Sequence, residues 1–226
     1  MKPLNTIFNL PVRFINLMYE STCSICNNSS ETEVVCQKCE QGFIERKGNH
    51  IKSFKEIPVY SWGLYSNTLR DGLIKLKNGR KELAKYFNKK LTGFWNTLPS
   101  KIKDKKYLVI SIPSHIKRVK ERGFCPSSLI ATEFSVGNKQ IFSKDYAIRT
   151  KETFHMNCLS SLNDRIININ NAFNISDNYA NEKDILIIDD ILTSGSTICE
   201  LSRTILKKYP NTNLIGLTVA SGDTFN

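Results

Sequence analysis

The sequence predicts an α/β fold in which a parallel sheet carries helices on both faces, with a small zinc-binding module in front of it. Three observations support this prediction. Short apolar runs typical of buried strands alternate with segments of helical periodicity. The clearest buried-strand pattern, 184–189, is followed by a loop rich in Thr, Ser and Gly. Four cysteines form two Cys-x2-Cys pairs near the start. We therefore expect residues 1–50 to hold an N-terminal helix and the zinc module, and residues 51–226 to form the α/β domain.

Strand and helix patterns alternate along the chain from residue 57 onward. The segment 57–65 alternates apolar and polar residues, which indicates a strand or hairpin. Helical spacing then follows in two segments, from Ser66 to a stop at Gly79 and again over 83–94. The remaining expected elements are a strand over 107–113, a helix over 129–134, a weak strand over 141–148, a strand over 184–189, a helix over 196–208 and a strand over 214–220.

The composition excludes several classes of protein. With 226 residues, of which 40% are apolar and 23% charged, the chain is neither disordered nor collagen-like. No segment reaches the ~18 consecutive apolar residues of a membrane span, and the first twenty residues suit a short helix beginning near Pro11 better than a signal peptide. The net charge of +11 predicts a polyanionic partner, either nucleic acid or a phosphorylated ligand, unless it reflects a general lysine bias.

The cysteine spacing predicts a structural zinc site. Cys23 and Cys26 form one pair, Cys36 and Cys39 the other, and a polar loop joins them, which matches a tetrahedral four-thiolate site. Two disulfides or redox-active thiols are the alternatives. The three other cysteines are scattered, and their odd number favours reduced thiols and a cytoplasmic location.

The segment 185–197 predicts a site for a ribose 5-phosphate. A buried strand ends in Asp189 and Asp190, and a hydroxyl-rich loop then enters a helix. Backbone N–H groups at a helix N-terminus bind phosphate, and a glycine lets the backbone approach it closely. The two acids precede the loop, where they can accept hydrogen bonds from a pair of sugar hydroxyls and face solvent. The expected loop contacts are Thr193, Ser194, Gly195, Ser196 and Thr197.

This segment resembles the PRPP-binding signature of type I phosphoribosyltransferases, with four apolar residues, two acids and Thr-x-Gly-x-Thr. Together with the cysteines, it makes the chain resemble the ComF family of competence proteins from Cys23 to the C-terminus. Three stretches between them contribute to the likeness: Tyr65…Leu69-Arg70…Ile74-Lys75-Leu-Lys77-Asn-Gly79, Ile112-Pro113…Arg118…Arg122-Gly123-Phe124 and Arg149…Thr153…Leu159…Arg165…Asn168…Ala172-Phe173. The chain departs from the family at Cys125-Pro126, where Asn-Gln is frequent, and at Met156, where Gln is usual.

The resemblance implies a type I phosphoribosyltransferase-like sheet that binds PRPP together with Mg2+. Neutralising the pyrophosphate requires cations, and Ser114, Arg118 and Arg122 in the loop after the first parallel strand are the expected contacts. A loop that closes over the site is expected at Arg149, Lys151 and Thr153.

The resemblance also implies a role in DNA uptake during natural transformation, on the cytoplasmic side. Single-stranded DNA and uptake machinery such as a helicase-like translocase are then the partners. The cations in 70–90 and 101–122, with aromatics between them, are compatible with single-stranded nucleic acid, although most of these aromatics are expected in the core. One alternative is an active phosphoribosyltransferase that transfers ribose 5-phosphate to a nitrogenous acceptor. Another is a PRPP-sensing, nucleic-acid-binding regulator without catalysis.

Overall fold

The computed structural model describes residues 21–30, 34–46, 51–54, 57–152, 162–178 and 183–222. The expected helix near Pro11 and the expected loop residue Thr153 lie outside these ranges. Within the described residues, no helix is long and apolar enough to cross a bilayer.

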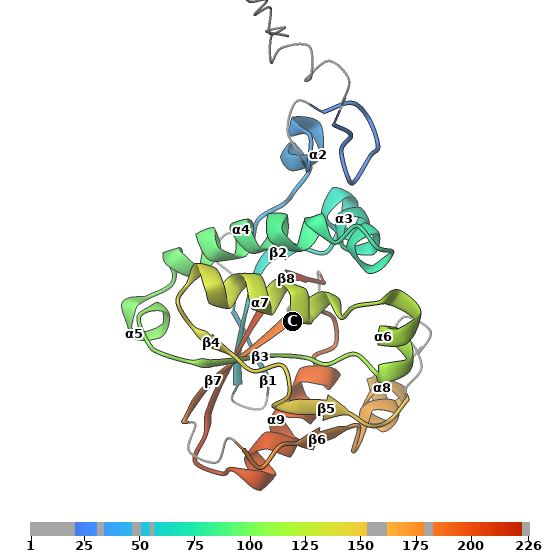
Figure 1. The fold of residues 1–226 in the computed structure, drawn as a ribbon. Coiled ribbons are helices and arrows are strands. Elements are labelled where there is room, and N and C mark those ends of the chain that lie inside the picture. The colour runs from blue at the N-terminus through green and yellow to red at the C-terminus, as the bar shows by residue number, and fades with distance from the viewer. Residues whose placement is uncertain are drawn as a thin grey trace, which may run out of the picture.

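A six-stranded sheet forms the centre of the molecule (Figure 1), and five of its strands are parallel. Its order is β1-β2-β8-β7-β3-β4, and only β1 runs antiparallel to its neighbour. The strands are β1 (Ile51–Phe54), β2 (Ile57–Leu64), β3 (Leu108–Ser111), β4 (Ile141–Phe142), β7 (Asp184–Leu192) and β8 (Asn213–Ser221). The α/β fold with a parallel sheet, expected from the alternating pattern, is therefore confirmed.

Alternating side chains of the central strand divide the core in two. Leu186 and Ile188 of β7 point to one face of the sheet, and Ile185 and Ile187 point to the other. All four are 0% exposed, as expected for a parallel strand covered on both faces. At ~25 cal/mol per Å2, each of these side chains contributes about 1.5–3 kcal/mol.

Helices α3 (Asn67–Lys77), α4 (Glu82–Thr97) and α7 (Pro126–Gly137) cover the first face (Figure 1). Their apolar residues recur at helical spacing, and Phe87, Leu91 and Trp95 of α4 are fully or almost fully buried. Trp95 packs edge-on against Phe134 of α7, with ring centroids 5.5 Å apart. These contacts hold α4 against α7 and the sheet.

The second face is covered by α9 (Ser196–Lys208), α8 (Leu162–Ile169) and a small two-stranded sheet. That sheet pairs β5 (Ala147–Arg149) with β6 (Phe173–Ile175) in antiparallel register. The single weak strand expected over 141–148 was wrong, because the segment contributes β4 to the main sheet and β5 to the small one. Residues 143–146 lie between the two strands.

Helices α2 (Gln37–Gln41) and α8 were not expected, and neither were two further short helices, α5 (Ser100–Lys103) and α6 (Ile116–Arg122). Neither α5 nor α6 buries a residue, so neither has the apolar stripe by which helices are found in a sequence. Helix α6 is bounded instead by local backbone chemistry. His115 accepts a hydrogen bond from the backbone of Lys117 at 3.4 Å, and Gly123 ends the helix in the left-handed conformation at φ 81°.

The cysteine module, with helix α2 (Gln37–Gln41), packs on α3 and α4. Its Ile25 and Val35 belong to the same hydrophobic cluster as the first face of the sheet. Gly72 of α3 permits this approach, because a Cβ there would lie 2.8 Å from Phe87 and 3.0 Å from Ile25. At the rim, the hydroxyl of Ser24 donates to Glu82 at 2.7 Å.

Candidate functional site

A cavity of about 540 Å3 opens at the carboxyl ends of the parallel strands. The chain leaves β3 toward β4 on one side and leaves the adjacent β7 toward β8 on the other. The loops after β3 and β7 therefore separate at this point, which is where ligands bind in open α/β sheets. Both loops line the cavity.

The β7–α9 loop brings the expected phosphate-binding residues together. Gly195 adopts the left-handed conformation at φ 73° and begins α9, which leaves the first N–H groups of the helix without helical acceptors. Thr193 and Thr197 line the cavity. The hydroxyls of Ser194 and Ser196 form a hydrogen bond to each other at 2.7 Å, which closes the turn. The loop thus presents backbone and hydroxyl donors to an anion.

The two acids at the end of β7 differ in their surroundings. Both line the cavity, but Asp190 is only 8% exposed and forms an ion pair with Lys77 at 2.9 Å. Asp189 accepts a hydrogen bond from the backbone N–H of Asp190 at 2.8 Å. Burial and the charge of Asp190 raise the pKa of Asp189 well above its usual value. The expectation of two solvent-facing acids therefore holds less well for Asp190, because Lys77 covers it.

Lys77 is held by these acids in its charged form. Burial alone would lower the pKa of Lys77, but the charge and hydrogen bond of Asp190 outweigh that effect, and the pKa is raised. Lys77 is the last residue of α3, where a cation also interacts favourably with the helix dipole. The side chain thereby joins α3 to the carboxyl end of β7.

Cations dominate the cavity wall. Five face it from three parts of the chain, against the two acids: Arg70, Lys77, Arg118, Arg122 and Arg149. Burial and the nearby charge of Arg122 lower the pKa of Arg118. Burial and the charge of Arg118 lower the pKa of Arg149 to about 10. Guanidinium groups crowded in this way favour an anionic ligand, which would relieve their mutual repulsion.

The residues expected from the loop after β3 divide between the cavity and the surface. Ser114, Arg118 and Arg122 line the cavity. Lys117, next to Arg118, instead pairs with Glu152 at 3.0 Å, and both side chains are more than half exposed.

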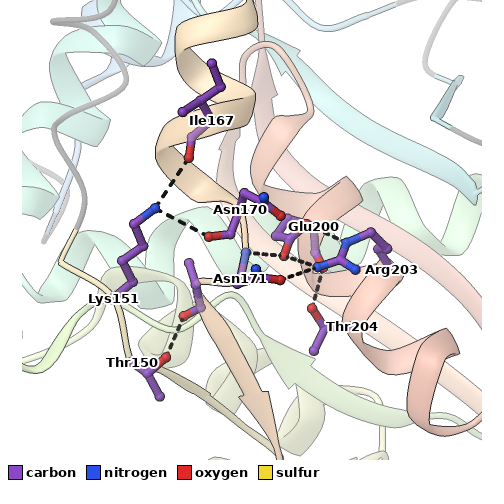
Figure 2. Close-up of polar contacts among 9 residues, drawn as sticks. Thr150, Lys151, Ile167, Asn170, Asn171, Glu200, Arg203 and Thr204 are labelled. Carbon is purple, nitrogen blue, oxygen red and sulfur yellow. Dashed lines mark hydrogen bonds and ion pairs between the residues drawn. The ribbon is translucent and has the colours of Figure 1, made fainter.

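Arg149 and Lys151, which were expected in a closing loop, lie in different places. Arg149 lines the cavity and is 9% exposed. Lys151 points elsewhere: Figure 2 shows its ammonium group reaching the end of α8, where it donates to the carbonyls of Ile167 and Asn170 at 3.4 Å. The same turn is fastened to α9, because buried Glu200 accepts from the backbone N–H of Asn171 at 2.7 Å (Figure 2). Lys151 thus ties its segment to α8.

Helix α3 supplies cavity residues that were not expected as ligand contacts. Arg70, Ile74 and Lys77 line the cavity from one side of the helix, and Tyr65 lines it from just before the helix. These three helical residues recur at i, i+4 and i+7, on the side of the helix that the buried residues Leu69 and Leu73 leave free. The helical spacing of these residues was visible in the sequence, but their position over the end of β7 depends on tertiary packing.

The four cysteines converge at the other end of the α3–α4 pair. The Sγ atoms of Cys23, Cys26, Cys36 and Cys39 all lie within 4.8 Å of one another. Those of Cys26 and Cys36 are 3.7 Å apart, close to the ~3.8 Å edge of a tetrahedron with zinc–sulfur bonds of ~2.3 Å. The backbone N–H of Cys36 donates to Cys23 Sγ at 3.3 Å, as expected around a metal-binding thiolate. The donor set and its geometry fit structural zinc.

Comparison with known proteins gives one curated relative of note. The competence protein ComFC of Bacillus subtilis (strain 168) is 23% identical over 188 residues, which cover 82% of this chain and 72% of ComFC. No family model matches the chain. The aligned stretch is long enough to span most of both proteins.

Proposed function

We propose that the chain is a ComF-family protein with an N-terminal four-cysteine zinc module, and that it binds PRPP or a related phosphorylated ribose in the cavity at the carboxyl ends of the strands. We also propose that it handles single-stranded DNA during uptake in natural transformation, on the cytoplasmic side of the membrane. The similarity to the competence protein ComFC supports the competence-associated role. The composition of the cavity supports the ligand.

The observation that carries the ligand proposal is the excess of cations in the cavity. Lys77 and Asp190 neutralise each other at 2.9 Å. Four arginines also line the cavity, together with Asp189, and the raised pKa of Asp189 reduces its negative charge. A single phosphate monoester carries about −1.5 to −2 at neutral pH, so this wall suits a ligand with more than one phosphate group. PRPP has a 5-phosphate and a pyrophosphate.

The proposed roles follow from position. The N-terminus of α9, with Thr193 and Thr197, would hold the 5-phosphate. The acids at the end of β7 would accept hydrogen bonds from the ribose hydroxyls, and Arg118 and Arg122 would bind the pyrophosphate. Bound together with PRPP, Mg2+ would neutralise part of the charge on the phosphate oxygens.

The test is calorimetric titration of the zinc-loaded protein with PRPP, with and without Mg2+. We expect micromolar binding, and we expect Arg118→Gln to weaken it at least tenfold, because a charge-assisted hydrogen bond contributes about 1.5–3 kcal/mol. Lys117→Gln is the matched control, since it removes a neighbouring cation that pairs outside the cavity. Absence of heat with well-folded protein, or equal weakening in both variants, would refute the proposal. Pyrophosphate released in the presence of candidate nitrogenous acceptors would indicate an active transferase.

A further inference from the structure

Three lysines lie in register along the amino edge of the sheet. Leu108 of β3 is paired with Ile141 of β4 on one side and with Ile185 of β7 on the other. Lys106, Lys139 and Lys183 each stand two residues before one of these paired positions. Adjacent strands are ~4.8 Å apart, so strand pairing brings three lysines that are distant in sequence to one row. We call these three residues the amino-edge lysines.

The amino-edge lysines surround a hollow rather than projecting from a flat surface. A cavity of about 490 Å3 is lined by all three of them, together with Tyr107, Leu108, Gln140, Ile141 and Asp184. The lysines are exposed, and Lys106 donates to the backbone carbonyl of Lys139 at 3.2 Å, which places their segments side by side.

The charge around this hollow is strongly positive. Its one acid, Asp184, forms an ion pair at 3.3 Å with a further lysine, Lys105. The amino-edge lysines are therefore the charged groups of the hollow that can contact a partner. A concave surface lined by one sign of charge concentrates the field and attracts counter-ions more strongly than a convex one.

A second row of lysines, which begins at the N-cap of α4 and continues along that helix, provides a comparison. Lys81, Lys85 and Lys89 are exposed at helical spacing and carry the same total charge. They lie along one helix and its N-cap position, and neither of the two cavities described above is lined by them. These lysines therefore provide the same positive charge outside the hollow.

The structure also limits the kinds of contact by which a nucleic acid could be bound. Tyr65 and Tyr86 are half-buried, but most of the aromatics that accompany the cations in the sequence lie in the core, among them Trp62, Trp95 and Phe124, which are between 2% and 7% exposed. Stacking of bases on these rings is therefore excluded in this conformation. The hollow offers the lysines for phosphates and the side chain of Ile141, 73% exposed, as an apolar contact for a base or sugar.

We propose that the amino-edge lysines bind the phosphates of single-stranded DNA. This inference rests on the DNA-handling role proposed above, and it identifies the surface that would bind the DNA. The hollow lies at the amino ends of the strands, whereas the 540 Å3 cavity lies at their carboxyl ends. The two sites do not overlap, so PRPP does not compete sterically with DNA and both can be occupied together.

The test compares two variants with equal loss of charge. One carries Lys106→Gln, Lys139→Gln and Lys183→Gln, and the control carries Lys81→Gln, Lys85→Gln and Lys89→Gln. Fluorescence anisotropy with a labelled oligothymidylate of about 20 nucleotides, long enough for several ~4–16-nucleotide sites, gives the affinity at several salt concentrations. The full zinc-loaded chain is used, and PRPP titration and thermal melting check the folding of both variants.

If three phosphate contacts are lost, the slope of log K against log[salt] should decrease in magnitude by about 2, since each contact contributes about 0.7 on single strands. Near 0.1 M salt this corresponds to roughly a tenfold to hundredfold loss of affinity in the amino-edge variant. The α4 control should stay within about twofold of the unmodified protein.

Three outcomes would overturn the inference: no binding by the unmodified protein, equal losses in both variants, or tighter binding of a duplex of the same length. The first outcome would also refute the proposed DNA-handling role, and the other two would not. Binding of DNA without PRPP binding would refute only the proposed ligand and leave the amino-edge site in place.

Discussion

The two adjacent acids at the end of β7 should respond in opposite directions to the same substitution. Asp190→Asn removes the partner of Lys77, whereas Asp189→Asn removes a charge that the fold disfavours. Because the residues are neighbours and the change is isosteric, each variant is the matched control of the other.

The cost of Asp190→Asn follows from the ion-pair distance. At 2.9 Å between Lys77 Nζ and Asp190 Oδ2, the attraction is about 1.4 kcal/mol with the screening of bulk water and about 6 kcal/mol at an effective dielectric constant of ~20. The side chain of Lys77 is 34% exposed, so screening favours the lower part of this range. We expect a loss of about 1–2 kcal/mol in the free energy of unfolding.

Asp189→Asn should stabilise the protein at neutral pH. The raised pKa of Asp189 means that its contribution to stability is complete below the unfolded pKa of ~3.9 and is lost as the pH rises through the folded pKa. Each pH unit in that window costs up to about 1.4 kcal/mol, and asparagine avoids the cost. Its amide oxygen can still accept from the backbone N–H of Asp190. The expected gain at pH 7.5 is about 1 kcal/mol or more.

Urea unfolding at several pH values between 4.5 and 8 measures both effects. The difference between Asp189→Asn and the unmodified protein should increase with pH and then level off above the folded pKa. Both variants should lose affinity for PRPP. Stability changes of the same sign, or a pH-independent difference for Asp189→Asn, would refute the electrostatic interpretation of this pair.

Two further predictions concern the zinc module and the attachment of α8. Cys36→Ser should lose stoichiometric zinc by atomic emission and lower Tm by about 10 °C, which corresponds to roughly 3 kcal/mol at this size; unchanged zinc content would show that the ligand set is wrong. Glu200→Gln weakens the acceptor of the Asn171 N–H and its ion pair with Arg203, so the Asn171 amide should exchange hydrogen about tenfold faster. Thr204→Val alters a neighbouring contact outside that acceptor group and should leave this exchange rate unchanged.

The elements with a clear apolar period could be predicted from the sequence. The run over 184–189 is apolar enough for a buried strand, and the structure extends it to Leu192 because residues beyond the acids still pair with β8. Helix α9 was expected at its observed bounds, because a glycine precedes it and its apolar residues recur at helical spacing.

What could not be predicted depends on long-range placement or on elements without a core face. Lys77 precedes Asp190 by 113 positions in the sequence, and it reaches Asp190 only because α3 packs above the end of β7. Arg118 and Lys117 are both cations of one loop, and only the start of α6 decides which of them faces the cavity. In the sequence the amino-edge lysines are three separate surface residues, and only the register of the strands shows that they are neighbours.

The close approach of Ile25 to Gly72 has a practical consequence for handling the protein. Gly72 lies midway along α3, and the same helix carries Arg70 and Lys77 into the 540 Å3 cavity. Loss of zinc would loosen the surface on which α3 rests, although none of the cysteines that the structure describes lines that cavity. Chelators in purification buffers, or metal capture by an affinity tag, would therefore lower the apparent ligand affinity of an otherwise intact preparation. A negative binding result is informative only when the zinc content of the same sample is known.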